Sequence, residues 1–171
     1  MRNIILEVRS VRRCAGGHTC NLVANGRKVA FIGPDIFEWS NNSQMVDVLE
    51  WYAAKQGTKL NDKPVRLEEG WEKAVPDHKV DRYEGVQAKL LRWIELHYLA
   101  YEAKQRSKQF VLCLDGLGDF YQFSFSEKSM PACLWKVIAD NKWDCMNKMT
   151  IEEIVAKLAT RRKLPTLPNA N

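Results

Sequence analysis

The 171-residue sequence predicts an α+β fold with a single antiparallel sheet and about four helices packed mainly on one face of that sheet. Two observations predict this class. Segments with strand alternation come in two runs, while segments with helical spacing lie between and after them, which favours α+β over an alternating α/β fold. In addition, the dipeptide Asn25-Gly26 separates two β-prone segments, a strong signal for an antiparallel hairpin.

The first run of strands is expected to be a meander. Residues 3–11 alternate between apolar and polar side chains, and a loop around residues 15–17 joins them to the hairpin. We expect three strands in this run. The last of them ends before Pro34, because proline cannot donate a hydrogen bond to a neighbouring strand.

The Asn-Gly turn also predicts the register of the hairpin. Both residues of a type I′ turn need positive φ, which asparagine and glycine tolerate best. The resulting two-residue loop places Leu22 opposite Val29, and Cys20 opposite Phe31. Because side chains alternate across a strand, these four residues share one apolar face, and the other face is mixed. One buried face and one wetter face are typical of an antiparallel sheet.

Two helices are expected after the meander. Ser43 is a good N-cap, and apolar residues recur behind it at helical spacing up to Gly57, which suits the left-handed position after a last turn. Residues 58–80 are expected to form an irregular surface excursion, followed by a long helix over residues 81–106. The inner stripe of the long helix is expected to consist of Val86, Leu90, Trp93, Ile94, His97 and Tyr101.

A second hairpin is expected over residues 109–126, with its loop at residues 115–119. Its first strand is apolar on both faces, which predicts a central position in the sheet. A third helix is expected near Pro131, since proline suits a first turn, and a fourth at Thr150, which opens a capping box.

The domain organisation is expected to be simple. One domain should span residues 1–163, and residues 164–171 should form a mobile tail. The 46% hydrophobic and 27% charged content is ordinary for a globular protein. No apolar run approaches the roughly 20 residues that a membrane span needs, so no membrane partner is expected. Five cysteines and no secretion signal favour free thiols and a cytoplasmic protein.

Two patterns of cysteine and histidine residues could support chemistry. Cys14, His18 and Cys20 lie within seven residues, but the gap between the cysteines is too long for a typical zinc site and no second ligand pair exists. We therefore expect no metal and no cofactor. Cys133 lies in the first turn of the third helix and could pair with His97 in a cysteine-dependent enzyme. No catalytic residue is assigned, because each of these side chains also suits a structural position.

Candidate binding residues come from two signals. Tryptophans in irregular segments and flanked by charge can act as interface anchors. Basic residues near the chain ends could face phosphates, in keeping with the net charge of +5. The candidate partner-binding residues are Trp39, Trp71, Arg12, Arg13, Arg161, Arg162 and Lys163.

The segment Cys20–Ile32, preceded by a strand and a short polar loop and followed by a helix, resembles small uncharacterised accessory proteins of bacterial phages and conjugative elements. The resemblance covers roughly residues 1–57. The chain departs from that group at residues 33–36, where the group has a more glycine-rich stretch. The resemblance implies a mobile-element setting and carries over no catalytic residue.

Three functions follow as hypotheses. The first is a non-enzymatic accessory protein that binds a host protein or nucleoprotein and inhibits a defence complex. The second is a nucleic-acid-binding domain that uses its basic surface, and the third is a cysteine-dependent enzyme. The sequence predicts no particular oligomeric state.

Overall fold

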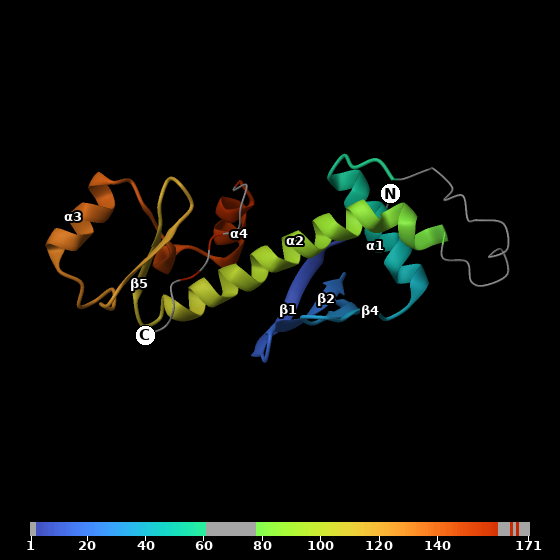
Figure 1. Ribbon diagram of the computed structural model, residues 1–171, viewed down its shortest axis with the longest axis horizontal. Helices are drawn as coiled ribbons and strands as arrows, with labels where there is room; N and C mark the ends of the chain where they lie inside the picture. Colours follow the sequence, from blue (N-terminus) through green and yellow to red (C-terminus); the bar gives the residue numbers. More distant parts are fainter. Residues whose placement is uncertain (1–2, 61–77, 161–164, 166, 168–171) are drawn as a thin grey trace. The chain divides into compact units, whose positions relative to one another are not determined.

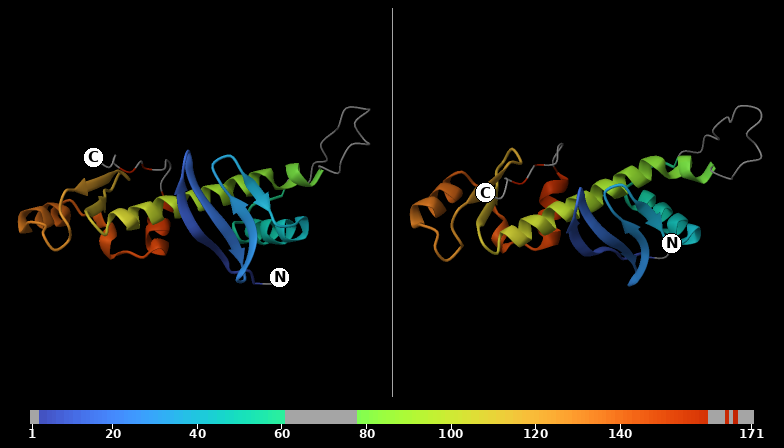
Figure 2. Two further views of the ribbon diagram at one scale, coloured as in Figure 1. Left: turned by 90° about the horizontal axis from the view of Figure 1, so that it is seen from below. Right: turned by 60° about the horizontal axis from the view of Figure 1, so that its bottom comes forward.

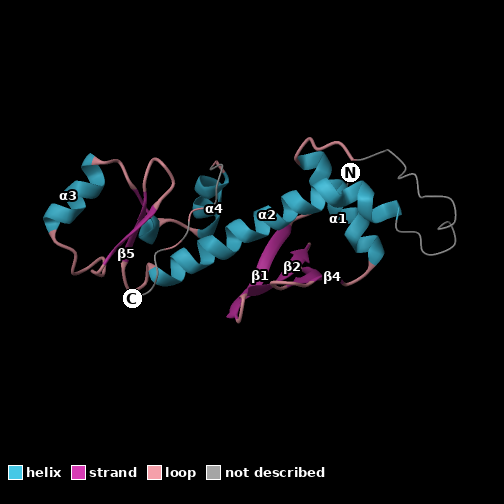
Figure 3. Ribbon diagram, in the orientation of Figure 1, coloured by secondary structure: helices cyan, strands magenta, loops and turns pink. Residues whose placement is uncertain are grey.

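The computed structural model describes residues 3–60, 78–160, 165 and 167, and it confirms the α+β class (Figures 1 and 3). The chain divides into two compact units, Met1–Arg92 and Trp93–Asn171. Within the described residues, each unit has its own antiparallel sheet, of four and three strands. The expectation of a single sheet is therefore wrong, because the two hairpins do not pair with each other. The extent of one domain over residues 1–163 stays a prediction.

The sheet of the first unit contains four strands in sequence order, and each pair of neighbours is antiparallel. Its strands are β1 (Leu6–Cys14), β2 (Gly17–Ala24), β3 (Arg27–Ile32) and β4 (Phe37–Trp39). The meander thus has one strand more than expected. The third strand does end at Ile32, but Gly33 and Ile36 hydrogen-bond each other's main chains and return the chain as β4. Figure 2 shows this sheet in two further views.

The predicted hairpin turn is confirmed, and part of the predicted register is wrong. Asn25 and Gly26 have φ of 50° and 77°, as the turn requires. Beyond Val23 a bulge shifts the pairing, so Leu22 lies opposite Ala30 and no longer opposite Val29. A bulge inserts one extra residue into one strand and exchanges the faces beyond it.

The consequence of the bulge is a change in which residues fill the core. Ile32, which now lies opposite Cys20, is only 3% exposed, whereas Phe31 is half-buried. Val29 is also buried, so three of the four expected core residues of the hairpin lie in the core.

A second irregularity lies in β1, at the edge of the same sheet. Its pairing with β2 shifts between Arg9 and Arg12, and Ser10 between them has a φ of 56°. Arg9, Ser10, Arg12 and Arg13 are all exposed. The edge strand is therefore interrupted in its middle by a left-handed residue and flanked by basic side chains.

Helix α1 (Asn42–Lys55) begins slightly earlier than expected. The N-cap is Asn41, whose Oδ1 accepts hydrogen bonds from the main-chain N–H of Gln44 at 2.8 Å and from the Ser43 hydroxyl at 2.9 Å. Ser43 is thus inside the first turn and not the cap. At the other end Gly57 has a φ of 59°, which confirms its predicted left-handed position.

Helix α2 (His78–Arg106) is the long helix, and it begins within the segment that was expected to be irregular. The first unit contains its residues up to Arg92, of which Tyr83, Val86 and Leu90 are buried. In the second unit the expected stripe is only partly right. Trp93, His97 and Tyr101 are half-buried there, whereas the buried residues are Ile94, Leu96, Ala100 and Ala103.

The second unit is built around β5 (Val111–Leu114), which lies between β6 (Phe120–Phe123) and β7 (Asp144–Cys145). All four side chains of β5 are fully buried, which confirms its predicted central position. The other elements of this unit are α3 (Ala132–Asp140), the 3₁₀ helix η1 (Met146–Lys148) and α4 (Ile151–Ala159).

The two faces of this sheet are both covered, so the expected packing of helices mainly on one face is wrong for the second unit. Leu112 and Leu114 pack with residues of α2 and α4. Val111 and Cys113 pack with Ile138, and with further residues of α3, on the other face. Figure 1 shows α3 and α4 on opposite sides of β5. A strand that is apolar on both faces needs cover on both.

Main-chain groups at the turns of the second unit are satisfied by nearby side chains. Asp115 Oδ1 accepts hydrogen bonds from the N–H groups of Leu117, Gly118 and Asp119 at 2.6–2.8 Å, so the glycine-containing loop is a turn organised around one carboxylate. The predicted capping box of α4 is present at Thr150.

Asn147 in η1 joins three main-chain groups of the second unit. Its Nδ2 donates to the carbonyl oxygens of Ser107 and Phe110 at 2.7 and 2.9 Å, and its Oδ1 accepts from the N–H of Leu112 at 2.9 Å. Lys104 Nζ donates to the carbonyl oxygens of Asn147 and Met149. The end of α2, the start of β5 and η1 are therefore held together by one amide and one ammonium group.

Candidate functional site

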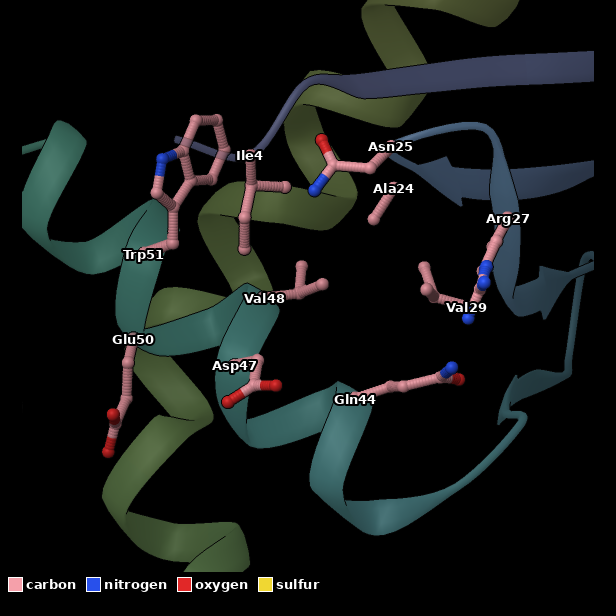
Figure 4. A pocket seen from close by; sticks show the side chains of 10 residues that line it. All are labelled: Ile4, Ala24, Asn25, Arg27, Val29, Gln44, Asp47, Val48, Glu50 and Trp51. Atoms are coloured by element: carbon pink, nitrogen blue, oxygen red, sulfur yellow. The ribbon is translucent and has the colours of Figure 1, made fainter. Parts of the chain in front are cut away.

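The first unit contains a hollow of about 710 Å³ between the β2–β3 hairpin and α1 (Figure 4). Asp47, Val48 and Trp51 of α1 lie three, four and seven positions after Gln44, so these four residues share one helix face, and Glu50 lies at its border. Asn25 and Arg27 come from the hairpin turn, and Ile4 precedes β1. The full lining is Ile4, Ala24, Asn25, Arg27, Val29, Gln44, Asp47, Val48, Glu50 and Trp51.

The hollow combines apolar walls with a polar rim. Val29 and Val48 are buried, and Ile4 and Trp51 are half-buried. In Figure 4, Ile4 lies beside the Trp51 ring, and Val48 faces the side of Val29. Asp47 and Arg27 are exposed at the rim, together with Asn25 and Glu50. An apolar centre surrounded by polar groups is the arrangement of protein interfaces and small-molecule sites.

Some polar side chains that line this hollow have no partner among the described residues. Gln44 Oε1 is buried and has no hydrogen-bond partner among the described residues. Asp47 and Arg27 also form no ion pair with any residue that the structure describes. Since an unmade bond to a buried acceptor is costly, a donor from a bound molecule or water would be stabilised beside Gln44.

Asn25 is held in place by its own hydrogen bonds. Its side-chain Oδ1 accepts from the N–H of Ile5 at 2.8 Å, and its main-chain N–H donates to the Ile5 carbonyl oxygen at 2.9 Å. These bonds fix the chain just before β1 against the hairpin turn, and with it the neighbouring Ile4. Two walls of the hollow are therefore connected by hydrogen bonds.

Glu50 belongs to the rim but has a partner. Its Oε1 accepts a hydrogen bond from the Tyr83 hydroxyl at 2.8 Å, and its side chain runs away from Val29 in Figure 4. Burial raises the pKa of Tyr83, and the bond to Glu50 raises it further, so the tyrosine is a neutral donor. Asp47 is therefore the carboxylate of the rim that is free to bind a cation.

Of the expected binding residues, the structure describes Arg12, Arg13 and Trp39, and it places Trp39 apart from the two arginines. Arg12 and Arg13 lie on β1 and Trp39 on β4, at opposite edges of the four-stranded sheet, three strand spacings or about 14 Å apart. Trp39 is half-buried, and its ring packs edge-on against Phe37 with centroids 5.1 Å apart. Trp71, Arg161, Arg162 and Lys163 lie outside the described residues.

The three residues of the candidate metal site, Cys14, His18 and Cys20, do not lie on one face of the sheet. His18 and Cys20 lie two residues apart on β2 and share a face, on which Cys20 is buried with 1% exposed. Cys14 pairs with Gly17, so its side chain lies on the other face of the sheet. Among the described residues, no group of three or more His, Cys, Asp or Glu side chains is arranged to hold a metal ion.

Cys133 and His97 have separate surroundings. Cys133 is exposed on α3. The His97 ring packs on Trp93, with centroids 4.1 Å apart, and its Nδ1 donates to the Trp93 carbonyl oxygen at 2.9 Å. Burial lowers the pKa of His97, while the Trp93 carbonyl and Glu152 act against this shift. The interactions of His97 are those of a structural histidine.

Comparisons with protein-family models, curated proteins and solved structures gave no match to this chain. In the described part of the chain, no helix has both the length and the apolar character to cross a bilayer. The hollow in the first unit is therefore the candidate functional site. Sequence reasoning missed it, although the mixed stripe of Gln44, Asp47 and Trp51 beside the apolar stripe of the same helix was a usable signal.

Proposed function

We propose that this protein is a non-enzymatic binding protein, and that its partner is another protein that places an apolar side chain and a neighbouring cationic group into the hollow beside α1. The observation that carries the proposal is the hollow itself, with Val29, Val48 and Trp51 around its centre and Asp47 at its rim. Apolar anchors surrounded by polar groups supply most of the binding energy of protein interfaces.

The charge of the rim favours a protein over a nucleic acid. The rim holds two carboxylates, Asp47 and Glu50, against the single cation Arg27, so its net charge disfavours phosphates. Asp47 would attract a lysine or arginine of a partner, and Arg27 a carboxylate. Gln44 Oε1 would accept a hydrogen bond from the partner's main chain or side chain. The phage or mobile-element setting, and inhibition of a host defence nucleoprotein, are part of the proposal and are supported by the sequence resemblance.

The other two functions have less support. Nucleic-acid contact depends on basic residues of the four-stranded sheet, and on basic residues at 161–163 that lie outside the described part of the chain. The residues on the sheet are Arg9, Arg12, Arg13, Arg27 and Lys28. Cysteine-dependent catalysis needs a base beside Cys133, and the interactions of His97 are with Trp93 and Glu152. Both stay predictions from the sequence.

The proposal is tested by affinity capture from a bacterial lysate with a matched pair of charge reversals. Asp47→Lys changes the rim of the hollow. Asp35→Lys makes the same change at another exposed carboxylate of the first unit, outside the hollow. We expect one set of proteins to be retained by the wild type and by Asp35→Lys, and to be lost with Asp47→Lys.

Trp51→Ala provides a second, uncharged change at the same site, and thermal unfolding of all variants checks that each is folded. The partner identified by mass spectrometry is then purified, and its binding is measured directly. Equal retention by Asp47→Lys and Asp35→Lys would remove the hollow as the binding surface. Turnover of a substrate by the purified chain, with no specific protein retained, would reject the proposed function itself.

A further inference from the structure

Two cysteines of the second unit lie directly opposite each other on neighbouring strands. Cys113 on β5 pairs with Cys145 on β7 in antiparallel register. Directly opposed residues in such a ladder have Cα atoms about 4.5 or 5.5 Å apart, depending on the type of pair. Both values fall within the roughly 4.4–6.8 Å that a disulfide spans. The backbone therefore already has the separation that a bond between these residues requires.

The side chains of the pair are also in contact. Each thiol is the first cause of the pKa shift of the other. Cys113 belongs to the buried cluster between the sheet and α3, and Cys145 packs against that cluster. Cys145 Sγ also donates a hydrogen bond to Asn147 Oδ1 at 3.6 Å. Cys113 is fully buried, while Cys145 is half-buried. Cys145 is thus the residue of the pair with surface open to a small reagent, and Cys113 can be reached through Cys145.

We propose that Cys113 and Cys145 form a redox-modification site, in which a low-molecular-weight disulfide such as oxidised glutathione converts the two thiols into a cross-strand disulfide. This site is separate from the hollow of the first unit and does not depend on the proposed function. It differs from the cysteine chemistry that the sequence suggested, because neither Cys133 nor His97 takes part.

The first step is attack by Cys145. Its thiolate sulfur bonds to one sulfur of the oxidised glutathione, whose S–S bond breaks and releases one glutathione thiolate. The pKa of Cys145 is lowered to about 6, first by the hydrogen bond from Cys113 and also by the main-chain N–H of Asn147. Lys148 lowers it as well, whereas burial and Glu127 act in the opposite direction. A thiolate is the form that attacks.

The second step is attack by Cys113 within the molecule. Its sulfur loses its proton to the released thiolate and bonds to Cys145 Sγ, while the bond between Cys145 and glutathione breaks. The second glutathione leaves as a thiolate and takes up the proton that Cys145 had given to water. Two thiols have then given two electrons to one disulfide, and two glutathione thiols are formed. The pKa of Cys113 is raised mainly by its bond to Cys145, so Cys113 stays protonated until the Cys145 sulfur is capped.

The bond would fix the outer strand of the three-stranded sheet. β7 has only two residues, Asp144 and Cys145, and leads directly into η1. A disulfide to β5 would hold β7 in place even when the main-chain hydrogen bonds between the two strands are broken. Reduction by an excess of thiol would release it.

The test uses the full chain, reduced and then incubated with defined mixtures of oxidised and reduced glutathione. Remaining thiols are blocked with iodoacetamide, and the products are mapped by mass spectrometry. We expect the loss of two hydrogens and a cross-link between the peptides of Cys113 and Cys145. Cys133→Ser should keep this cross-link, because Cys133 is exposed on another element.

Two further variants separate the steps. Cys145→Ser should abolish the cross-link and leave Cys113 reduced, whereas Cys113→Ser should accumulate glutathione on Cys145. If Cys133 carries glutathione while Cys113 and Cys145 stay reduced in the wild type, the proposal is overturned. A cross-link between any other pair of cysteines overturns it equally. Neither outcome depends on the folding of a variant, because both are read in the wild-type protein.

Discussion

Replacing Asn147 by alanine should destabilise the second unit more than any exposed polar substitution there. The change removes a weak hydrogen bond accepted from Cys145 Sγ at 3.6 Å and three stronger ones. The three stronger bonds are donated to the carbonyl oxygens of Ser107 and Phe110 and accepted from the N–H of Leu112. All three are part-buried and join segments 35–40 positions apart in the sequence. A hydrogen bond contributes about 0.5–1.5 kcal/mol net, so the three together contribute roughly 1.5–4.5 kcal/mol.

We expect a loss near the middle of this range, about 3 kcal/mol, because water can replace part of the lost bonding at a half-buried position. Asn141→Ala is the matched control in the same unit. The Asn141 side chain makes a single hydrogen bond, to the Val137 carbonyl oxygen, and is exposed. The control should lose less than about 1 kcal/mol.

The assay is urea unfolding followed by tryptophan fluorescence, combined with hydrogen exchange of the Leu112 amide. In Asn147→Ala this amide should lose protection, because its acceptor is gone. The reasoning is refuted if Leu112 keeps its wild-type protection, or if the two asparagine variants lose the same free energy of unfolding.

Three further outcomes are expected. Gly26→Ala should lower the free energy of unfolding by about 1–2 kcal/mol in urea, because Gly26 has a φ of 77°, which alanine adopts at a cost. A Cβ at this position would meet no atom within 4 Å, so the loss comes from the backbone conformation alone. An unchanged free energy of unfolding would contradict the turn geometry. Thr150→Ala should cost about 1 kcal/mol through loss of the α4 cap, and Thr150→Ser should recover most of it. Because burial lowers the pKa of His97, the unfolded chain binds a proton at higher pH than the folded one, and stability should fall as pH drops below about 6.5. His97→Gln should reduce the fall in the free energy of unfolding between about pH 7 and pH 5. An unchanged dependence of this free energy on pH would contradict the role given to His97.

Local signals were the most predictable part of this fold. The Asn25 turn, the Thr150 capping box and the left-handed Gly57 were all expected from a few neighbouring residues, and each is present. These features depend on backbone preferences that a short sequence window contains. The central position of β5 was also predictable, because four consecutive apolar residues leave no face for water.

The errors arose where distant segments decide the outcome. The bulge opposite Leu22 changes which residues of β3 face the core, and nothing in the turn sequence announces it. The apolar character of β5 implied cover on both faces, but its helices were still expected on one face. The pairing of β5 with the two-residue β7 follows from Asn147 and its neighbours, which hold η1 against the end of α2.

The candidate site was harder to predict than the fold. Tryptophans in irregular segments are expected to bind, and that stays a prediction: Trp39 packs on Phe37, and Trp71 lies outside the described residues. Trp51, which the sequence places on a helix, lines the hollow. A helix face that mixes Asp47 and Gln44 with apolar residues appears unremarkable in sequence. It becomes a wall only when the hairpin turn with Arg27 lies opposite, and this is a tertiary arrangement.

The interruption of β1 has a consequence for how the protein behaves at high concentration. A nine-residue edge strand offers unpaired main-chain groups on which another molecule could continue the sheet. The left-handed Ser10 divides that edge into two short pieces, and Arg12 and Arg13 place like charges on the second piece. Two copies meeting edge to edge would repel each other and could not align their ladders, so the edge is protected against growth into fibrils.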